Sequence, residues 1–374
     1  MKIENANIFR NGKFEFGSIV FDRQIWAEEE SSSAETKTVL DAEGGYLIPG
    51  LVDIHTHAAM GADASDGDPD GIARMASYYA AGGVTAFCPT TMTLPEDVLK
   101  RAIRSICDCE LPENSARIAG IHLEGPFVSR EKCGAQNPDY IARPNSEMFK
   151  RLQEEADGTI RLITIAPETE GAEGFIREVS RMCAVSLGHT TADYDTAMRA
   201  FVAGASHATH LFNAMPPLQH RAPGVIAAAS DAMATVELIS DGLHVHPAVV
   251  RLTHRLFGHR LVLISDSLRC TGMPDGTYEL GGQLITLQDQ KATLQGTDTL
   301  AGSCIHLMEG LRRAVSFGIP LEAAVTAATE TPAKAIGVFD RIGSIAQGKE
   351  ADLVLLDDSL QVKDVFVGGK KVGS

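Results

Sequence analysis

The chain has 374 residues, of which 44% are hydrophobic, and its mean hydropathy is close to zero. Its 33 basic and 49 acidic residues give a net charge of −16, which argues against nucleic acid and anionic membranes as partners. No segment approaches 18 uninterrupted apolar residues, and the first residues lack the basic and apolar regions of a signal peptide. With seven irregularly spaced cysteines, these features predict a globular cytoplasmic protein with reduced thiols, made of one large domain and a smaller one.

Short stretches of alternating polar and apolar residues, typical of strands, occur at both ends of the chain. They cover residues 2–10 and 13–21 near the amino terminus, and 351–356 and 362–372 near the carboxyl terminus. Neither end is long enough to form a core of its own. We therefore expect residues 1–48 and 338–374 to pair into a small β-sandwich domain beside the main domain.

Eight short apolar or β-branched runs between these ends predict strands, at 51–57, 84–90, 117–125, 161–168, 184–189, 208–212, 235–241 and 260–266. Segments with helical patterns separate most of them, at 69–81, 95–107, 146–155, 173–182, 193–203 and 247–257. This alternation predicts an α/β fold, a parallel (β/α)8 TIM barrel over residues 49–337. The alternative is a doubly wound open sheet, but no Gly-rich nucleotide-binding sequence follows the first strand.

Several of the predicted strands end in side chains that can bind a metal ion. His55 and His57 leave the first strand on the same side, because residues two apart in a strand point the same way. The other strand-end candidates are Glu124, His189, His210 and Asp266. One such residue is commonly only a capped polar side chain, but in a barrel all six would meet at one face. Four imidazoles and two carboxylates suit a divalent ion such as zinc, with iron as the alternative.

These residues also carry a family resemblance. The His-x-His after Pro49-Gly50, with single ligands at later strand ends, resembles the amidohydrolase superfamily. Within it, the chain is similar over nearly its whole length to the N-acetylglucosamine-6-phosphate deacetylases, through the motifs His-Leu-Glu-Gly-Pro at 122–126, Gly-His-Thr at 188–190, Thr-His-Leu-Phe-Asn-Ala-Met at 209–215, Asp-Gly-Leu-His at 241–244 and Leu-Ala-Gly-Ser at 300–303. The resemblance implies a homodimer that hydrolyses an acetamido sugar phosphate to acetate and an amino sugar phosphate.

The resemblance further implies roles for individual residues. It puts Glu124, His189 and His210 on a catalytic metal ion, and it makes Asp266 the general base and acid. His55 and His57 would hold a second ion with Glu124 bridging, so one or two divalent ions are expected per chain. Positions that match the substrate contacts of the family are Ala135, Gln136, Asn213, Ala214, Arg221, His244, Ala301 and Gly302.

Two of these positions have other interpretations from the sequence alone. His244 could be a structural histidine of the loop after the seventh strand. Arg221, beside Pro223-Gly224, reads without the resemblance as an exposed charge, whereas the resemblance has it reach the phosphate bound by the neighbouring subunit, so that the dimer shares its active sites.

At Gln136 the chain departs from the family pattern. Family members commonly have Gly-Ala-His or Gly-Thr-His where this chain has Gly134-Ala135-Gln136, and a neutral amide can donate a hydrogen bond but cannot carry a proton. Another acetamido sugar or its phosphate, such as N-acetylgalactosamine 6-phosphate, or a cyclic amide therefore stays open as the substrate. A noncatalytic metal-binding or sugar-binding relative is the second alternative, and the presence of all six strand-end residues argues against it.

Overall fold

Eight parallel strands form the centre of the computed structural model, which describes residues 1–26 and 38–373. In the order in which they pair they are β5 (Leu51–Thr56), β8 (Val84–Thr91), β10 (Ile121–Glu124), β11 (Ile160–Ile165), β12 (Ala184–Leu187), β13 (His207–Ala208), β14 (Thr235–Ile239) and β15 (Leu261–Ile264), with β9 (Arg117–Ile118) beside β8. Three backbone hydrogen bonds join the last strand to the first at their carboxyl ends: Asp266 N–H donates to the His55 carbonyl (2.9 Å), and the N–H groups of His57 (3.1 Å) and Ala58 (3.0 Å) donate to the Ser267 carbonyl. The prediction of a (β/α)8 barrel is confirmed.

The barrel strands are apolar because both of their faces are covered. Every residue of β5 and β8 is buried, as expected for strands with side chains in the barrel on one side and helices on the other. In contrast to these strands, which are buried on both faces, the helices have their apolar residues at every third or fourth position, on the side that faces the barrel. In α3 (Glu96–Cys107), Leu99, Ile103 and Ile106 are buried, whereas the opposite side carries charged residues.

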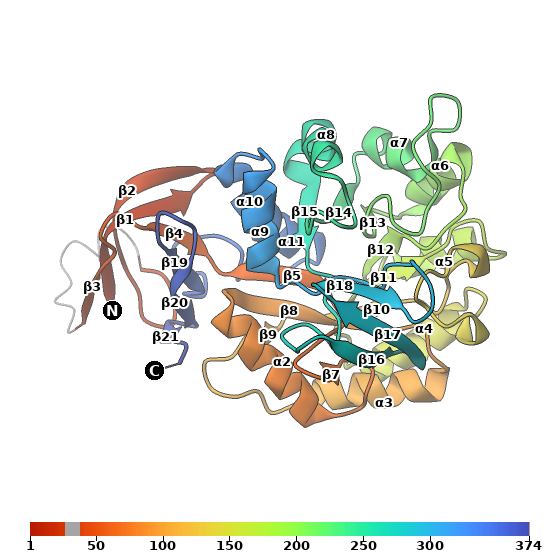
Figure 1. The fold of residues 1–374 in the computed structure, drawn as a ribbon, viewed down its shortest axis with the longest axis horizontal. Helices are drawn as coiled ribbons and strands as arrows, with labels where there is room; N and C mark the ends of the chain where they lie inside the picture. Colours follow the sequence, from red (N-terminus) through yellow and green to blue (C-terminus); the bar gives the residue numbers. More distant parts are fainter. Residues whose placement is uncertain (27–37, 374) are drawn as a thin grey trace.

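The remaining helices of the described residues surround the barrel (Figure 1). They are α2 (Pro69–Ala81), α4 (Ser146–Glu155), α5 (Ala172–Val179), α6 (Tyr194–Ala203), α7 (Gly224–Asp231), α8 (Pro247–Phe257), α9 (Leu307–Ser316), α10 (Leu321–Ala328) and α11 (Glu330–Ala335), with short 3-10 turns at Arg130–Lys132, Pro138–Tyr140 and Gly258–Arg260. All six predicted helices are present. Helices α7, α9, α10 and α11 were not predicted from the sequence. In α7 five of eight residues are buried, and the polar face is too narrow to give a helical pattern. None of these helices has the length and apolar character of a membrane span.

The two ends of the chain form a separate mixed sheet at one side of the barrel, where both termini lie (Figure 1). Its strands are β1 (Lys2–Arg10), β2 (Lys13–Val20), β3 (Val39–Asp41), β4 (Tyr46–Pro49), β19 (Leu353–Leu356), β20 (Val362–Val367) and β21 (Lys370–Lys371). The rings of Phe21 and Phe366 meet edge to face at 5.4 Å, so the sheet curls around a small core of its own. A small β-domain built from both ends is therefore present, while its exact limits, 1–48 plus 338–374, stay a prediction.

A second, antiparallel sheet lies after the last barrel strand. It consists of β16 (Gly276–Leu280), β17 (Gln283–Gln288) and β18 (Lys291–Leu294), and a two-residue ribbon, β6 (Ala58–Ala59) with β7 (Ala62–Asp63), follows the first barrel strand. The tight turns at Gly281-Gly282 and Asp289-Gln290 have positive φ at all four residues, which is the geometry of two-residue hairpins. Gln283 Nε2 donates to the carbonyl of Ala135 (2.7 Å), which ties this sheet to the loop after β10. The sheet thus borders the carboxyl ends of the barrel strands.

Candidate metal centre

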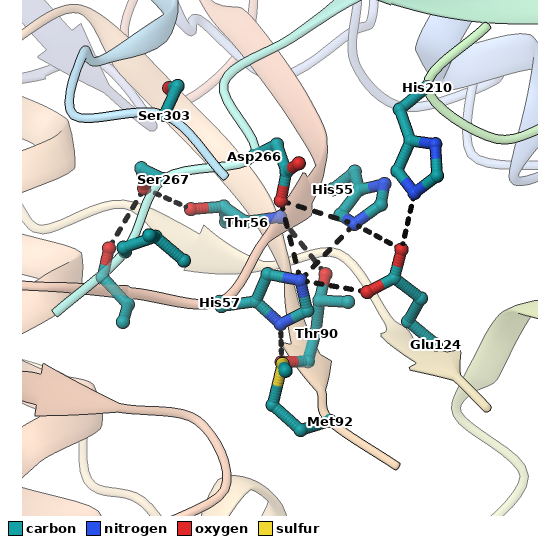
Figure 2. A network of polar contacts seen from close by, with 12 residues as sticks. His55, Thr56, His57, Thr90, Met92, Glu124, His210, Asp266, Ser267 and Ser303 are labelled. Carbon is teal, nitrogen blue, oxygen red and sulfur yellow. Dashed lines mark hydrogen bonds and ion pairs between the residues drawn. The ribbon is translucent and has the colours of Figure 1, made fainter. Parts of the chain in front are cut away.

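The six strand-end residues converge at the carboxyl end of the barrel. Figure 2 shows five of them, His55, His57, Glu124, His210 and Asp266, directed toward one another. All six are buried, although they come from β5, from β10 and from the residues that follow β12, β13 and β15. Two groups of three have ligand atoms within 4.8 Å of one another: Glu124 with His189 and His210, and His55 with His57 and Asp266. The structure therefore brings together every metal-site candidate that the sequence singled out.

The carboxylate of Glu124 lies between these two groups and contacts all four imidazoles. Its Oε1 is 2.9 Å from His210 Nε2, 3.2 Å from His189 Nε2 and 3.3 Å from His55 Nε2. Its Oε2 is 3.0 Å from His57 Nε2. One carboxylate that faces two ligand sets is the arrangement of a bridging ligand between two metal ions.

The outer nitrogens of the rings indicate which ring atoms face the centre as acceptors. His57 Nδ1 lies 3.0 Å from the carbonyl of Thr90, and His189 Nδ1 lies 2.9 Å from the carbonyl of Lys132. A carbonyl oxygen can only accept, so each Nδ1 carries hydrogen and each Nε2 of the neutral ring presents a lone pair inward. These lone pairs face the oxygens of Glu124, and such a set of acceptors needs a cation among them. The donor set fits a divalent ion of the zinc and iron type.

The electrostatics of the buried groups leads to the same conclusion. Burial raises the pKa of Glu124, but His55 and His189 outweigh it and hold that pKa well below its ordinary value. Burial lowers the pKa of His57, but hydrogen bonds to Asp266 and Glu124 outweigh it and raise that pKa to about 10. The carboxylates thus stay ionised and attract positive charge, which a metal ion supplies in place of protons.

Asp266 is also ionised at neutral pH. Burial raises its pKa, but the charge of His55 and the hydrogen bond to His57 outweigh burial and lower it below the ordinary value. Its Oδ1 lies 3.4 Å from His57 Nε2 and 3.6 Å from His55 Nε2. Asp266 can therefore accept a proton, and it is also close enough to the histidine pair to serve as a ligand.

The backbone is strained where three of these residues leave their strands. His189, His210 and Asp266 have φ values of 47°, 26° and 48°, in the region that residues other than glycine rarely adopt. Such a conformation costs about 1–2 kcal/mol per residue. Because the turn comes directly after each strand, it directs the side chain over the mouth of the barrel. The packing of the surrounding fold compensates for the conformational free energy of these positive φ angles.

A cavity of about 490 Å³ opens above the centre. Its lining includes most residues that the resemblance assigned to substrate, namely Ala135, Gln136, Asn213, Ala214, His244 and Gly302. Ala301 is fully buried behind this wall. Arg221 is exposed and lies outside the lining of the cavity in this chain. Lys132, Glu131 and Asp298 line the cavity as well, and the sequence analysis did not single them out.

Gln136 contacts the metal centre directly. Its amide nitrogen donates to Glu124 Oε2 (2.6 Å), and its amide oxygen accepts from the backbone N–H of Thr93 (2.7 Å). The side chain is buried, with 2% of its surface exposed. In this structure the residue that departs from the family pattern therefore orients the central carboxylate.

His244 is held by the acidic residue three positions before it. Its Nδ1 lies 2.7 Å from Asp241 Oδ2, and Asp241 Oδ1 accepts the backbone N–H of both Leu243 and His244. Burial raises the pKa of Asp241, but these contacts with His244 outweigh it and lower that pKa. Asp241 thus fixes the ring orientation of a histidine that lines the cavity.

The sequence analysis missed the buried polar residues beneath the centre. Glu237 and His122 are completely buried, and Glu237 lies 2.8 Å from His55 Nδ1. The signal was present in the sequence, since Glu237 interrupts an apolar strand and His122 is a second polar residue two positions before Glu124. A charged residue inside a strand that is otherwise apolar indicates a partner in the interior.

A parallel barrel with histidine and carboxylate ligands at its strand ends defines a class of metal-dependent hydrolases. Residues 46–372 match the amidohydrolase family, and the chain belongs to this family. Within it, the chain is similar to the N-acetylglucosamine-6-phosphate deacetylases. It is 39% identical to the enzyme of Bacillus subtilis (strain 168), over 89% of this chain and 86% of that protein, and 33% identical to the enzyme of Homo sapiens, over 100% and 95%.

A solved structure agrees with these similarities in sequence. A variant of the N-acetyl-D-glucosamine-6-phosphate deacetylase of Mycobacterium smegmatis, in complex with N-acetyl-D-glucosamine-6-phosphate, superposes with a TM-score of 0.92 at 34% identity. The match covers 100% of this chain and 99% of that one. The fold of this chain is therefore the same as that of the Mycobacterium smegmatis enzyme.

The close packing beneath the ligand loops gives a prediction about Gly188. A Cβ atom at Gly188 would lie 2.7 Å from Thr209 Cβ and 2.9 Å from Thr164 Cγ2. Gly188→Ala should lower the free energy of unfolding by about 1–3 kcal/mol, as for other overpacked interiors, and weaken zinc binding because His189 and His210 follow the displaced residues. Denaturant unfolding and zinc titration of the apo-protein measure both effects.

The matched control is Gly174→Ala in α5, where a Cβ would have no neighbour within 4 Å. It should stabilise the protein by roughly 0.5–1 kcal/mol and leave zinc binding unchanged. Wild-type stability in Gly188→Ala would show that the ligand loops tolerate this displacement.

Proposed function

We propose that the chain is a metal-dependent hydrolase that removes the acetyl group from N-acetyl-D-glucosamine 6-phosphate, giving acetate and D-glucosamine 6-phosphate. The observation that carries this proposal is the contact of Glu124 with all four imidazoles, beside an ionised Asp266 in a cavity of sugar size. The identity of 39% to a deacetylase of this sugar phosphate supports the choice of substrate. A cytoplasmic location is part of this proposal.

Zinc is the proposed cofactor, with iron as the alternative, in one or two ions per chain. Glu124, His189 and His210 would hold the first ion, and His55 and His57 would hold the second, with Glu124 bridging. A divalent ion in such a site lowers the pKa of water toward about 7 and polarises the acetyl carbonyl.

Asp266 is the proposed proton carrier. Attack of water on the acetyl carbon requires removal of a proton from that water, and the ionised carboxylate accepts it. Breakage of the C–N bond then requires protonation of the departing nitrogen, since an unprotonated amine leaves poorly. Asp266 delivers the same proton to this nitrogen, so the step consumes one water and returns the carboxylate to its ionised form.

The remaining wall of the cavity would bind the sugar. His244, oriented by Asp241, offers Nε2 to the carbonyl oxygen or to a sugar oxygen. Asn213 and Ala214 lie on the loop after β13 and line the same cavity. Arg221 lies outside this cavity in its own chain, so it is proposed to cross a two-fold interface and bind the phosphate held by the neighbouring subunit.

The function is tested by acetate release from N-acetylglucosamine 6-phosphate by purified, zinc-loaded protein. The phosphorylated sugar should be used at least tenfold better than N-acetylglucosamine or N-acetylgalactosamine 6-phosphate. A preference for either of the other two would replace the proposed substrate, and absence of acetate release from all of them would favour a noncatalytic role.

The first prediction from this mechanism concerns Asp266. Asp266→Asn should reduce kcat on the order of 10² to 10⁴ because the amide cannot carry the proton, while folding and zinc content stay near wild type. Steady-state kinetics and elemental analysis measure these quantities. Activity within a few-fold of wild type would refute the assignment of Asp266.

The second prediction concerns the number of metal ions. The apo-protein should bind up to two equivalents of zinc, and the double variant His55→Gln with His57→Asn should bind one, because the Glu124 group is left intact. Equilibrium titration with metal analysis counts the ions. A wild-type stoichiometry of one under excess zinc would exclude the two-metal site without excluding the hydrolase.

The third prediction joins Arg221 to the dimer. Arg221→Ala should raise KM for the phosphorylated sugar and barely change a slow activity on the unphosphorylated one, because the contact is equal in the ground and transition states. Mixing Arg221→Ala chains with Asp266→Asn chains should restore one intact site per heterodimer. Equal losses on both substrates, or no recovery in subunits shown to have exchanged, would place Arg221 away from the phosphate.

A further inference from the structure

Glu237 is a charged residue in the interior of the barrel that the proposed mechanism leaves without a role. It lies in the middle of β14, between Val236 and Leu238, and its side chain is completely buried. It does not line the cavity, so it cannot contact a substrate there. A carboxylate in such a place is very costly unless it is paired and hydrogen-bonded.

The carboxylate finds its partners among the candidate metal ligands. Glu237 Oε2 lies 2.8 Å from His55 Nδ1 and accepts the backbone N–H of His210 at 3.0 Å. Oε1 lies 3.1 Å from Nε2 of His207, which is also buried. Through Oε2 alone, Glu237 thus contacts both the ring of one candidate ligand and the backbone of another.

The contact with His55 fixes the tautomer of that ring. Glu237 Oε2 accepts the backbone N–H of His210 and faces His55 Nδ1, and Oε1 faces His207 Nε2, so both oxygens of the carboxylate are directed at nitrogen atoms. A carboxylate oxygen in this position accepts, so His55 Nδ1 carries the hydrogen. Nε2 of His55 then presents its lone pair to the centre, 3.4 Å from His57 Nε2 and 3.3 Å from Glu124 Oε1.

The Nδ1 contact of His55 is with a side chain, whereas those of His57 and His189 are with backbone carbonyls. His57 and His189 donate from Nδ1 to the carbonyls of Thr90 and Lys132. A carboxylate accepts a stronger hydrogen bond than a neutral carbonyl and makes the ring a more basic ligand. Only the orientation of His55, among these three rings, therefore depends on a side chain that a substitution can remove.

We propose that Glu237 is a positioning residue that holds His55 in the tautomer and orientation needed to bind the second metal ion. This inference rests on the proposed function, because it concerns the same metal centre. The His55 ring, Glu237 and His122 also lie close enough to form a further group of potential ligands. That group would require the Nδ1 atom of His55, which the hydrogen bond to Glu237 already uses.

The test is Glu237→Gln, which keeps the size of the side chain but removes the charge and replaces a group that only accepts with an amide that can also donate to His55. Zinc is titrated into the apo-protein against a chromophoric chelator. The dissociation constant of one zinc ion should rise about 10- to 100-fold, the range typical for loss of an outer partner of a metal ligand, while the other ion should bind within about threefold of wild type.

Asp352→Asn is the matched control for loss of a buried charge. Asp352 is 4% exposed, accepts from Arg117 Nη2 (2.7 Å) and from the backbone N–H of Gly368 (2.8 Å), and lies at the terminal sheet, remote from the ligands. Its substitution should change stability but neither zinc constant. Equal weakening of zinc binding in both variants would mean that destabilisation, and not positioning, is the cause.

The outcomes separate this inference from the proposed function. Wild-type zinc constants in Glu237→Gln would overturn the inference and leave the hydrolase intact, whereas a wild-type protein that binds no divalent ion would overturn both. A third zinc ion lost in Glu237→Gln would assign Glu237 as a ligand instead. If Glu237→Gln does not fold, ¹⁵N-histidine spectra of the zinc-loaded wild-type protein, assigned with a His55→Gln variant, decide: His55 must carry its hydrogen on Nδ1, and hydrogen on Nε2 overturns the inference.

Discussion

The burial of the Glu124 carboxylate among four imidazoles is the constraint on which the rest of the site depends. A carboxylate that is 2% exposed is stable only with compensating charge, and apart from the Gln136 amide its neighbours are ring nitrogens that present lone pairs. Protons on the rings can supply that charge, and so can a divalent ion. The fold thus creates a place where a cation is required, and each surrounding ligand loop is arranged to face it.

The barrel satisfies this requirement because the contacts that close it between its last and first strands also position the residues of the site. The backbone hydrogen bond from Asp266 to His55 joins the last strand to the first, and it also places the proposed proton carrier beside the histidine pair. Left-handed backbone at His189, His210 and Asp266 then turns each side chain inward at its strand end. The tightly packed, fully buried strands below, β5, β8 and β15, compensate for the cost of these conformations.

Around the ligands lies a set of outer contacts that determine which atom of each ring faces inward. Backbone carbonyls accept from Nδ1 of His57 and His189, Asp241 contacts Nδ1 of His244, and Glu237 contacts Nδ1 of His55. Gln136 does the same for Glu124, the central carboxylate. Such outer partners orient a metal ligand and tune its basicity, so the properties of the centre extend well beyond the residues that would touch the ion.

Local pattern in the sequence determined the barrel, the terminal sheet and the identity of the strand-end residues. Periodicity separates strands such as 84–90 from helices such as 69–81. Because the carboxyl ends of parallel barrel strands lie at one face, the sequence alone predicted that His55, Glu124 and Asp266 are close together. Periodicity alone did not predict α7, whose polar face is narrow, and helices α9, α10 and α11 were overlooked. The hairpins of β16 to β18 were overlooked too, although their turns are visible in the sequence. Only the tertiary structure decided that Gln136 binds Glu124, that Arg221 lies outside the cavity of its own chain, and that Glu237 anchors His55. The physical reason is that side-chain direction within a barrel depends on register and on strand-end turns, and partners such as Glu237 and His55 are 182 residues apart in the chain.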